Sequence, residues 1–268
     1  MQLRDAVVVI TGAGSGIGAA MARRFAAEGA AALLLADIDE ASVTALADEL
    51  ATDSCRALAR RVDVGDREQV EEMVAAAVSE LGPIDLLCSN AGIGAGAGLD
   101  APDEDWDRLW RINVMAHVHA ARAALPAMVE RGSGYLLQTA SAAGLLTTPG
   151  DAPYTATKHA AVGLAEWIAV TYGGRGVKVS ALCPQAVNTP LLQGPAEEGN
   201  ASALAVRGAS AVLEPEDVAD AVVRGLADER FLILPHAEVA DHVAFKVADR
   251  DRWIAAIRRA LAGSGTIA

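Results

Sequence analysis

The sequence predicts an α/β fold in which a doubly wound parallel sheet of about seven strands carries helices on both faces. Short apolar runs of strand length alternate along most of the chain with amphipathic stretches of helix length. The apolar runs lack the strict polar alternation of a sheet with one solvated face, which is typical of strands covered by helices on both sides. Such alternation of strand and helix also favours right-handed crossovers within a single sheet.

Each apolar run predicts a strand, and the amphipathic stretches predict the connecting helices. The expected strands are Ala6–Ile10, Ala32–Ala36, Ala57–Val62, Ile84–Cys88, Tyr135–Thr139, Val177–Leu182 and Phe231–Leu234. The expected helices lie near residues 17–28, 40–51, 67–81, 103–130, 153–172, 215–227 and 251–262. No Pro- or Ser-rich linker divides the chain, so we expect one domain over residues 1–268, with a C-terminal helical segment near 236–262.

The composition excludes several classes of protein. The 268 residues are 52% hydrophobic, which excludes a disordered chain, and the net charge of −13 disfavours binding to nucleic acid. We see no secretory leader and no apolar run long enough to span a membrane, so we expect a cytoplasmic protein without a membrane partner. The three cysteines form no C-x-x-C pair, and His117 and His119 point in different directions on a helix. No metal site is therefore expected.

A glycine-rich turn follows the first expected strand and begins the first helix. Residues Thr11–Gly18 read TGAGSGIG, where glycines let the backbone approach a pyrophosphate and the helix N-terminus offers free N–H groups. Asp37 ends the second strand, where a carboxylate can accept both ribose hydroxyls of an adenosine. These features predict a dinucleotide site. The absence of a basic residue close after Asp37 predicts NAD rather than NADP, because a 2′-phosphate would lie beside a carboxylate.

Tyr154 and Lys158 are four residues apart near the start of a predicted helix and therefore share one face. A free tyrosine has a pKa of about 10, but a neighbouring ammonium group favours the phenolate and lowers that pKa. Tyr154 is then expected to exchange a proton with an alcohol or a carbonyl oxygen. Ser141 follows a strand and is expected to hydrogen-bond to the same oxygen. The chain has only two other lysines, Lys178 and Lys246.

These motifs together resemble the short-chain dehydrogenase/reductase family in its shorter, one-domain, NAD-dependent form, which has a Rossmann-type fold. The resemblance runs from about Val7 to about Leu234. It implies a catalytic tetrad of Asn113, Ser141, Tyr154 and Lys158. The cofactor contacts that it implies are Gly12, Ser15, Gly16, Ile17, Gly18, Asp37, Asp63, Val64, Asn90, Ala91, Gly92, Tyr154, Lys158, Pro184, Val187 and Thr189.

The resemblance also implies a distorted helix at Asn113 and a water that bridges Asn113 to Lys158. The chain departs from the family at Gln185, where the P-G-x-V-x-T pattern has glycine. Two loops rich in small residues, Ser89–Leu99 and Pro184–Val212, follow strands at the edge where such sheets bind ligands. We expect a substrate lid within residues 184–212, and few charged groups near the substrate.

The most consistent function is NAD-dependent interconversion of an alcohol, secondary and largely apolar, with its ketone or aldehyde. One alternative is reduction of a 3-oxoacyl thioester, although such reductases usually use NADPH and a basic residue near the glycine loop. A second is a non-catalytic NAD-binding sensor or scaffold. The family resemblance implies a homotetramer or homodimer, and small residues along the 153–172 helix would let a second copy pack closely.

Overall fold

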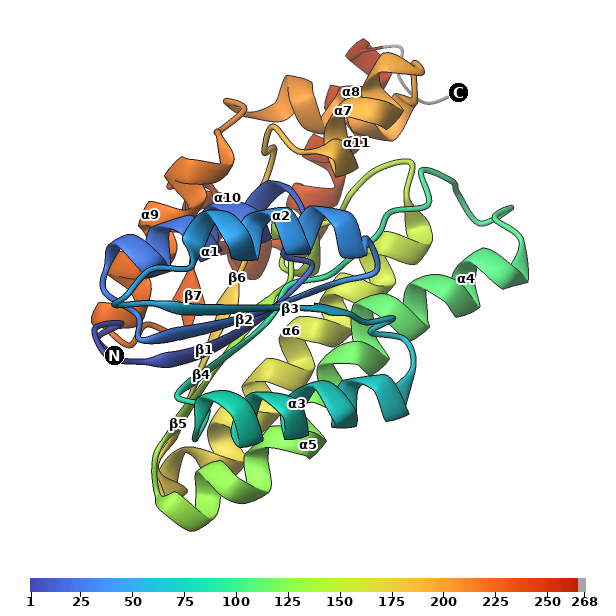
Figure 1. Ribbon diagram of the computed structural model, residues 1–268. Coiled ribbons are helices and arrows are strands. Elements are labelled where there is room, and N and C mark those ends of the chain that lie inside the picture. The colour runs from blue at the N-terminus through green and yellow to red at the C-terminus, as the bar shows by residue number, and fades with distance from the viewer. Residues whose placement is uncertain (265–268) are drawn as a thin grey trace.

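The computed structural model describes residues 1–264 (Figure 1), so residues 265–268 of the expected domain lie outside the described residues. Within residues 1–264, seven parallel strands form one sheet in the order β3-β2-β1-β4-β5-β6-β7. The strands are β1 (Val7–Thr11), β2 (Ala32–Asp37), β3 (Arg56–Arg61), β4 (Leu86–Ser89), β5 (Gly134–Thr139), β6 (Val177–Leu182) and β7 (Leu232–Ile233). The predicted fold class is confirmed, and each predicted strand overlaps one of these.

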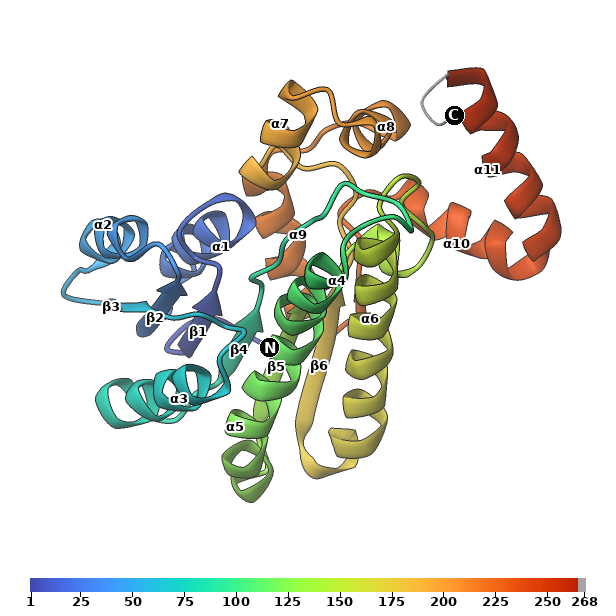
Figure 2. The same cartoon turned by 90° about the vertical axis from the view of Figure 1, so that its right-hand side faces the viewer.

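Helices cover both faces of the sheet (Figures 1 and 2). One face carries α1 (Gly16–Ala27), α2 (Glu40–Leu50) and α9 (Pro215–Ala227), and the other carries α3 (Arg67–Leu81), α5 (Ala116–Arg131) and α6 (Ala152–Tyr172). Successive residues of β1 point to opposite layers, since Val8 and Ile10 pack with the first set and Val9 with the second. Burial on both faces explains why the strands have no polar alternation.

The parallel register brings the carboxyl ends of the central strands to one edge of the sheet. Ile10 of β1 pairs with Cys88 of β4, and Cys88 pairs with Leu137 of β5. The strand order reverses between β1 and β4, and open α/β sheets bind ligands at such a reversal. The loops that follow β1, β4, β5 and β6 all leave from this edge.

The helix predicted over residues 103–130 is interrupted. It consists of α4 (Asp103–Trp110), a π-helical turn η1 (Arg111–Met115) and α5. Asn113 lies within η1 and is fully buried. The helix distortion expected at Asn113 is therefore present.

The segment after β6 contains two short helices, α7 (Pro190–Glu197) and α8 (Ala201–Ala209), rather than a continuous loop. Pro190 occupies the first turn of α7, where its missing N–H costs nothing. Asn200 caps α8 by accepting a hydrogen bond from the Ala203 N–H at 3.1 Å. Pro190 and Asn200 are signals for a helix start, but the many small residues around them make the segment resemble a loop in the sequence.

The chain after β7 forms α10 (Glu238–Ala248) and α11 (Arg250–Ser264). The helices are separated at Asp249, whose side chain accepts a hydrogen bond from the Arg252 N–H at 2.9 Å. Figure 2 shows α11 beyond α10, on the opposite side of the molecule from α2. Among the helices of residues 1–264, none has the length and apolar character needed to cross a membrane.

Candidate functional site

The glycine loop after β1 is tightly packed against the loop after β4. Gly12 has a φ of +65°, and a Cβ atom there would lie 2.8 Å from the Ala91 Cα. A Cβ on Gly18 would lie 2.0 Å from the Gly12 carbonyl oxygen. Ser15 precedes α1 in an extended conformation, and Gly16 and Ile17 begin the helix. Glycine is thus required for the loop to turn this closely, and the first N–H groups of α1 are presented at the edge of the sheet.

Asp37 is held beside this loop. One of its carboxylate oxygens, Oδ2, accepts a hydrogen bond from the Gly14 N–H at 2.9 Å. The other, Oδ1, accepts one from the Asp39 N–H at 3.1 Å. The carboxylate at the end of β2 is therefore oriented next to the helix N-terminus, in the arrangement expected for a group that accepts ribose hydroxyls.

Asp63 and Val64 follow β3. The Asp63 Oδ1 accepts a hydrogen bond from the Gly65 N–H at 2.8 Å, and its Oδ2 lies 4.0 Å from the Arg111 guanidinium. The Val64 side chain is buried. Arg111 belongs to η1, so this contact connects the loop after β3 with the π-helical turn.

Asn90 joins the ends of three strands. Its side-chain Nδ2 donates to the Thr11 carbonyl at 3.1 Å and to the Gly12 carbonyl at 3.2 Å. Its Oδ1 accepts from the Thr139 Oγ1 at 3.0 Å, at the end of β5. The next residue, Ala91, donates its N–H to the Thr11 Oγ1 at 3.3 Å.

Gly92 lets the loop after β4 approach two of the predicted catalytic residues. A Cβ atom at Gly92 would lie 3.2 Å from the Lys158 Nζ and 3.3 Å from the Asn113 Oδ1. The Asn113 Oδ1 accepts from the Ile93 N–H at 2.9 Å, while its Nδ2 donates to the Ile93 carbonyl at 2.9 Å and to the Thr157 Oγ1 at 3.2 Å. Asn113 thus joins η1, the loop after β4 and the helix α6.

The Lys158 ammonium group is buried, and no carboxylate within residues 1–264 pairs with it. Its side chain is 3% exposed, and its Nζ donates to the Thr139 carbonyl at 3.1 Å. Burial lowers the pKa of Lys158 to about 8, and the neighbouring Cys183 thiol acts weakly in the other direction. A proton leaves this lysine more easily than it leaves an exposed one.

Tyr154 does not have the lowered pKa that the sequence led us to expect. Burial raises the pKa of Tyr154 to about 12, and a hydrogen bond with Ser141 opposes this shift without cancelling it. The Lys158 Nζ is 5.5 Å from the centroid of the tyrosine ring. The expectation was wrong for the protein alone, because a poorly solvated environment disfavours the phenolate more strongly than Ser141 favours it.

Ser141 lies between β5 and the loop after β6. Its Oγ accepts from the Ala143 N–H at 3.1 Å and is 3.4 Å from the Pro184 carbonyl. The side chain is 8% exposed. Ser141 also acts on the pKa of Tyr154, so the structure brings Ser141, Tyr154, Lys158 and Asn113 together at the carboxyl edge of the sheet.

The loop after β6 closes onto the glycine loop. A Cβ atom on Gly16 would lie 2.9 Å from the Thr189 Cγ2. The Thr189 N–H and Oγ1 both donate to the Val187 carbonyl, at 2.8 and 3.4 Å. Gln185 donates its N–H to the His236 Nδ1 at 3.2 Å, whereas its own side-chain Oε1 is buried with no hydrogen-bond partner among the described residues.

Two residues that organise the site were missed in the sequence. Asp151 caps α6 by accepting from the Tyr154 N–H at 3.0 Å, and its other oxygen accepts from the Ala95 and Gly96 N–H groups at 3.0 and 2.7 Å. The D-A-P order before Tyr154, an acid followed by proline in the first helical turn, could have identified this cap. His236 has no such signal. Its Nε2 lies 3.1 Å from the Ala186 carbonyl and 3.2 Å from the Ala211 carbonyl, at opposite ends of the 184–212 segment.

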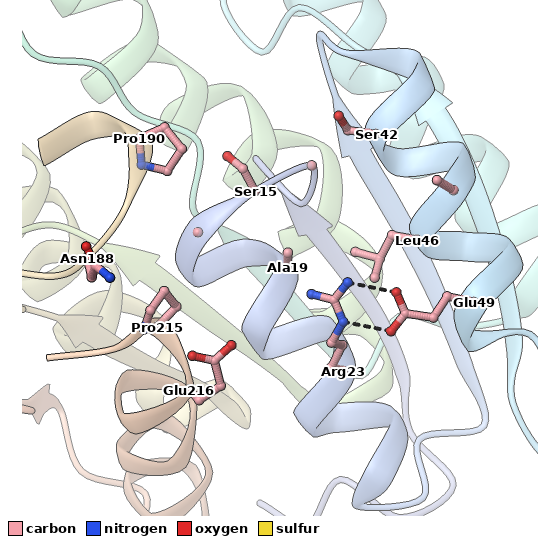
Figure 3. Close-up of a pocket in the computed structure, with 13 residues that line it drawn as sticks. Ser15, Ala19, Arg23, Ser42, Leu46, Glu49, Asn188, Pro190, Pro215 and Glu216 are labelled. Carbon is pink, nitrogen blue, oxygen red and sulfur yellow. Dashed lines mark hydrogen bonds and ion pairs between the residues drawn. The ribbon is translucent and has the colours of Figure 1, made fainter. Parts of the chain in front are cut away.

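A hollow of about 420 Å³ lies on the outer side of the glycine loop, between α1, α2 and the start of α9 (Figure 3). Among the residues that line it, Arg23 is the basic one, and its guanidinium makes two hydrogen bonds of 2.7 Å to Glu49. The hollow also contacts Gly14 and Ser42, close to the carboxylate of Asp37. A phosphate group there would find its cation already paired. Within residues 1–264, no three His, Cys, Asp or Glu side chains are grouped to hold a metal ion.

A glycine loop at the start of α1, a carboxylate at the end of β2 and the neighbouring Ser141, Tyr154 and Lys158 side chains are typical of an oxidoreductase of the Rossmann type. The sequence profile of the short chain dehydrogenase family matches residues 6–199, and the chain belongs to that family. It is 36% identical to a 1-deoxy-11-beta-hydroxypentalenate dehydrogenase of Streptomyces exfoliatus, over 89% of this chain and 86% of the relative. It is 38% identical to a meso-2,3-butanediol dehydrogenase of Serratia marcescens, over 85% of this chain and 90% of the relative.

Among solved structures, the fold is similar to a short chain dehydrogenase/reductase of Burkholderia phymatum in complex with NAD. The TM-score is 0.85 and the sequence identity 33%, over 94% of this chain and 96% of that chain.

Replacing Asp151 tests whether the cap holds the site together. We expect Asp151→Ala to lower the free energy of unfolding by about 1–3 kcal/mol, because one N-terminal N–H of α6 and two loop N–H groups lose their acceptor. The measurement is urea unfolding at a fixed protein concentration, with Asp66→Ala as the control, since Asp66 caps α3 alone. A loss of stability no greater than that of Asp66→Ala would contradict a role beyond capping.

Proposed function

We propose that the protein is an NAD-dependent dehydrogenase that interconverts a secondary, largely apolar alcohol and its ketone. The observation that carries the proposal is the placement of Tyr154 between Ser141, which lowers its pKa, and the buried Lys158 ammonium group, 5.5 Å from the tyrosine ring, beside the closely packed glycine loop. The names of the two curated relatives, both dehydrogenases of hydroxyl compounds, support the reaction class.

The residues around the glycine loop fit NAD. Free N–H groups at Ser15–Gly18 suit the pyrophosphate, and the Asp37 carboxylate suits the adenosine ribose. Asp63 and Val64 would contact the adenine, and Asn90–Gly92 would line the passage to the catalytic residues. Pro184, Val187 and Thr189 would hold the nicotinamide amide, while Tyr154 and Lys158 would contact its ribose. When bound, NAD supplies the acceptor for a hydride.

The side chains of the site can then carry the proton. Ser141 hydrogen-bonds the alcohol oxygen and holds it against the Tyr154 hydroxyl, which takes its proton in oxidation and returns it in reduction. The Lys158 ammonium group, fixed by the Thr139 carbonyl, favours the phenolate that forms. Asn113, in η1, makes two hydrogen bonds to the backbone of Ile93 and lies near Lys158. We therefore assign to Asn113 a supporting role: it would help to hold the water through which the proton leaves Lys158.

The walls of the site favour an apolar substrate. Leu145 and Leu146 follow the Ser141 turn, and Leu191 and Leu192 lie at the start of α7. We propose that residues 184–212 act as a lid over this space. The two ends of that segment are held together, because Val187 pairs with Leu213 and His236 contacts the carbonyls of both Ala186 and Ala211. A segment fixed at both ends in this way can move as a unit, which supports its role as a lid.

The alternatives have less support. A 3-oxoacyl-thioester reductase would be expected to use NADPH, which the Asp37 carboxylate and the paired Arg23 disfavour. A sensor without turnover would not need the Ser141–Tyr154–Lys158 arrangement. We further propose a cytoplasmic homotetramer or homodimer. Trp167 and Val170 on α6 are 58% and 86% exposed and offer an apolar surface to a second copy. Because the protein has a net charge of −13, we do not expect nucleic acid as a partner.

The direct test is an assay of NADH formation with secondary alcohols of graded size and polarity. We expect turnover with apolar secondary alcohols and little with carboxylates. A protein that binds NAD but oxidises no alcohol and reduces no ketone would instead support the sensor.

Tyr154→Phe should abolish turnover without loss of cofactor binding. The phenyl ring keeps the packing but cannot exchange a proton, so kcat should fall by about 10²- to 10⁴-fold. Tyr172→Phe, at the far end of the same helix, is the matched control and should leave kcat unchanged. Steady-state assays with NADH-fluorescence titration measure both effects. Substantial turnover by Tyr154→Phe would remove Tyr154 from the mechanism.

The reaction should depend on pH differently in its two directions. The raised pKa of Tyr154, about 12 in the protein alone, keeps the phenol protonated at neutral pH. Oxidation needs the deprotonated base, so kcat/KM for the alcohol should rise with pH between about 6 and 9. Reduction needs the protonated phenol, so kcat/KM for the ketone should stay nearly constant over the same range. Initial rates in both directions across that range are the measurement, and a flat profile for the alcohol would exclude this assignment.

The protein should prefer NAD over NADP by about ten- to a hundredfold in kcat/KM, because a 2′-phosphate would be repelled by Asp37. Asp37→Ser should reduce the ratio of the two kcat/KM values, chiefly because it weakens the binding of NAD. Ile38→Arg should move the ratio further, toward NADP, because it adds a positive charge next to the 2′-phosphate. Asp39→Ser removes the same charge two residues away and should have a smaller effect. Equal kcat/KM values for both cofactors in the unmodified protein would show that Asp37 does not contact the ribose.

A further inference from the structure

Lys246, on α10, is the second buried lysine of the protein and lies far from Lys158 in sequence. Its side chain is 9% exposed. Its Nζ donates to the Leu145 carbonyl at 2.7 Å and to the Leu146 carbonyl at 2.8 Å. The same atom lies 3.5 Å from the His159 Nε2 on α6. A residue of the C-terminal segment therefore reaches the turn that follows Ser141.

All three protons of the Lys246 ammonium group have an acceptor. The His159 Nδ1 is 2.9 Å from the Thr155 carbonyl, which is an acceptor only, so Nδ1 carries the ring proton and Nε2 accepts from Lys246. The Trp253 ring on α11, with its centroid 5.0 Å from Nζ, covers the remaining side. None of these partners is a carboxylate. Burial, followed by the charge of Arg250, lowers the pKa of Lys246.

The two carbonyls belong to the residues that directly follow the short 3-10 turn η2 (Ala142–Gly144), and no backbone N–H of the described residues donates to them. Within the turn, the Leu145 and Leu146 N–H groups both donate to the Ala142 carbonyl, at 3.0 and 2.8 Å. The Ala143 N–H donates to the Ser141 Oγ at 3.1 Å. A short series of hydrogen bonds thus connects Lys246 to the hydroxyl of Ser141.

We propose that Lys246 is a positioning residue for the reaction: it holds the η2 turn so that the Ser141 hydroxyl faces Tyr154 and Leu145 and Leu146 form the substrate wall. This inference rests on the proposed function for the roles of Ser141 and the substrate wall. It also assigns a purpose to α10, which lies outside the sheet and reaches the η2 turn through Lys246, and to α11, whose Trp253 ring lies beside that lysine.

A merely structural lysine would behave differently. If Lys246 only contributed to stability, its removal would lower the melting temperature while leaving kcat and KM of the folded protein unchanged. If it positions the turn, its removal displaces a group that touches the reacting oxygen, and displacements of about 1 Å from remote changes can cost about a hundredfold in rate. Cofactor affinity should be unaffected, because the glycine loop is held by Asn90 instead.

The test compares Lys246→Met with Lys178→Met. Lys178 is half-exposed on β6 and pairs with Glu229, so it is a matched control outside the site. We expect Lys246→Met to lower kcat/KM for the alcohol by about ten- to a hundredfold, with the Kd for NADH within about twofold of wild type, and Lys178→Met to change neither. Lys246→Arg keeps the charge and the donors and should recover part of the loss. Wild-type kcat/KM in folded Lys246→Met would overturn the proposal.

Hydrogen exchange gives a readout that does not depend on activity. In Lys246→Met, the backbone amides of residues 143–146 should exchange faster, while those of the glycine loop stay unchanged; unchanged exchange at 143–146 would also overturn the proposal. If Lys246→Met does not fold, Lys246→Arg decides, since wild-type exchange and kcat/KM together in that variant would show that the geometry of the ammonium group is immaterial. A wild-type protein inactive toward every alcohol would refute the proposed function, and the exchange data would still test the contact.

Discussion

Asn90 follows β4, and its side-chain amide hydrogen-bonds to the ends of the two neighbouring parallel strands, donating to Thr11 and Gly12 at the end of β1 and accepting from Thr139 of β5. The glycine loop takes its position from the first two contacts. The Thr139 carbonyl in turn accepts from Lys158, so the lysine is positioned from the same strand end. A single planar group therefore sets the spacing between the glycine loop and Lys158. A hydrophobic contact could not do so, because it lacks direction.

Burial acts in opposite directions on the two titrating groups of the site. It raises the pKa of Tyr154 to about 12 and lowers that of Lys158 to about 8, so each group is shifted toward its neutral form. A positive charge arriving near both would lower both pKa values, because it favours the phenolate and disfavours the ammonium. The protonation of both groups is consequently sensitive to the charge of whatever lies beside them.

Local sequence patterns were sufficient for much of the fold and of the site. The TGAGSGIG turn, Asp37 and the Tyr154–Lys158 pair were found because their chemistry depends on neighbours a few residues away, and the structure does bring these residues to one edge. The contacts that hold them could not be found in this way. Lys246 meets Leu145 across 101 residues, and His236 meets Ala186 across 50. The direction of the Tyr154 pKa shift was missed for a related reason, since spacing reveals a neighbouring charge but not the depth of burial.

The π-helical turn η1 separates two helices that would otherwise continue as one. A π turn accommodates one more residue than an α turn, and each residue of an α-helix advances the side chains by about 100°. The turn therefore rotates the side-chain pattern of α4 relative to that of α5. Trp110, just before η1, is half-exposed, whereas Asn113 within η1 and His117 after it are buried. The contacts of Asn113 with Ile93 and Thr157 thus depend on a change of register within one helix. Deletion of a single residue between 111 and 115 would restore a regular α-helix, and the side chains of α4 and of Asn113 could not both keep their present orientations.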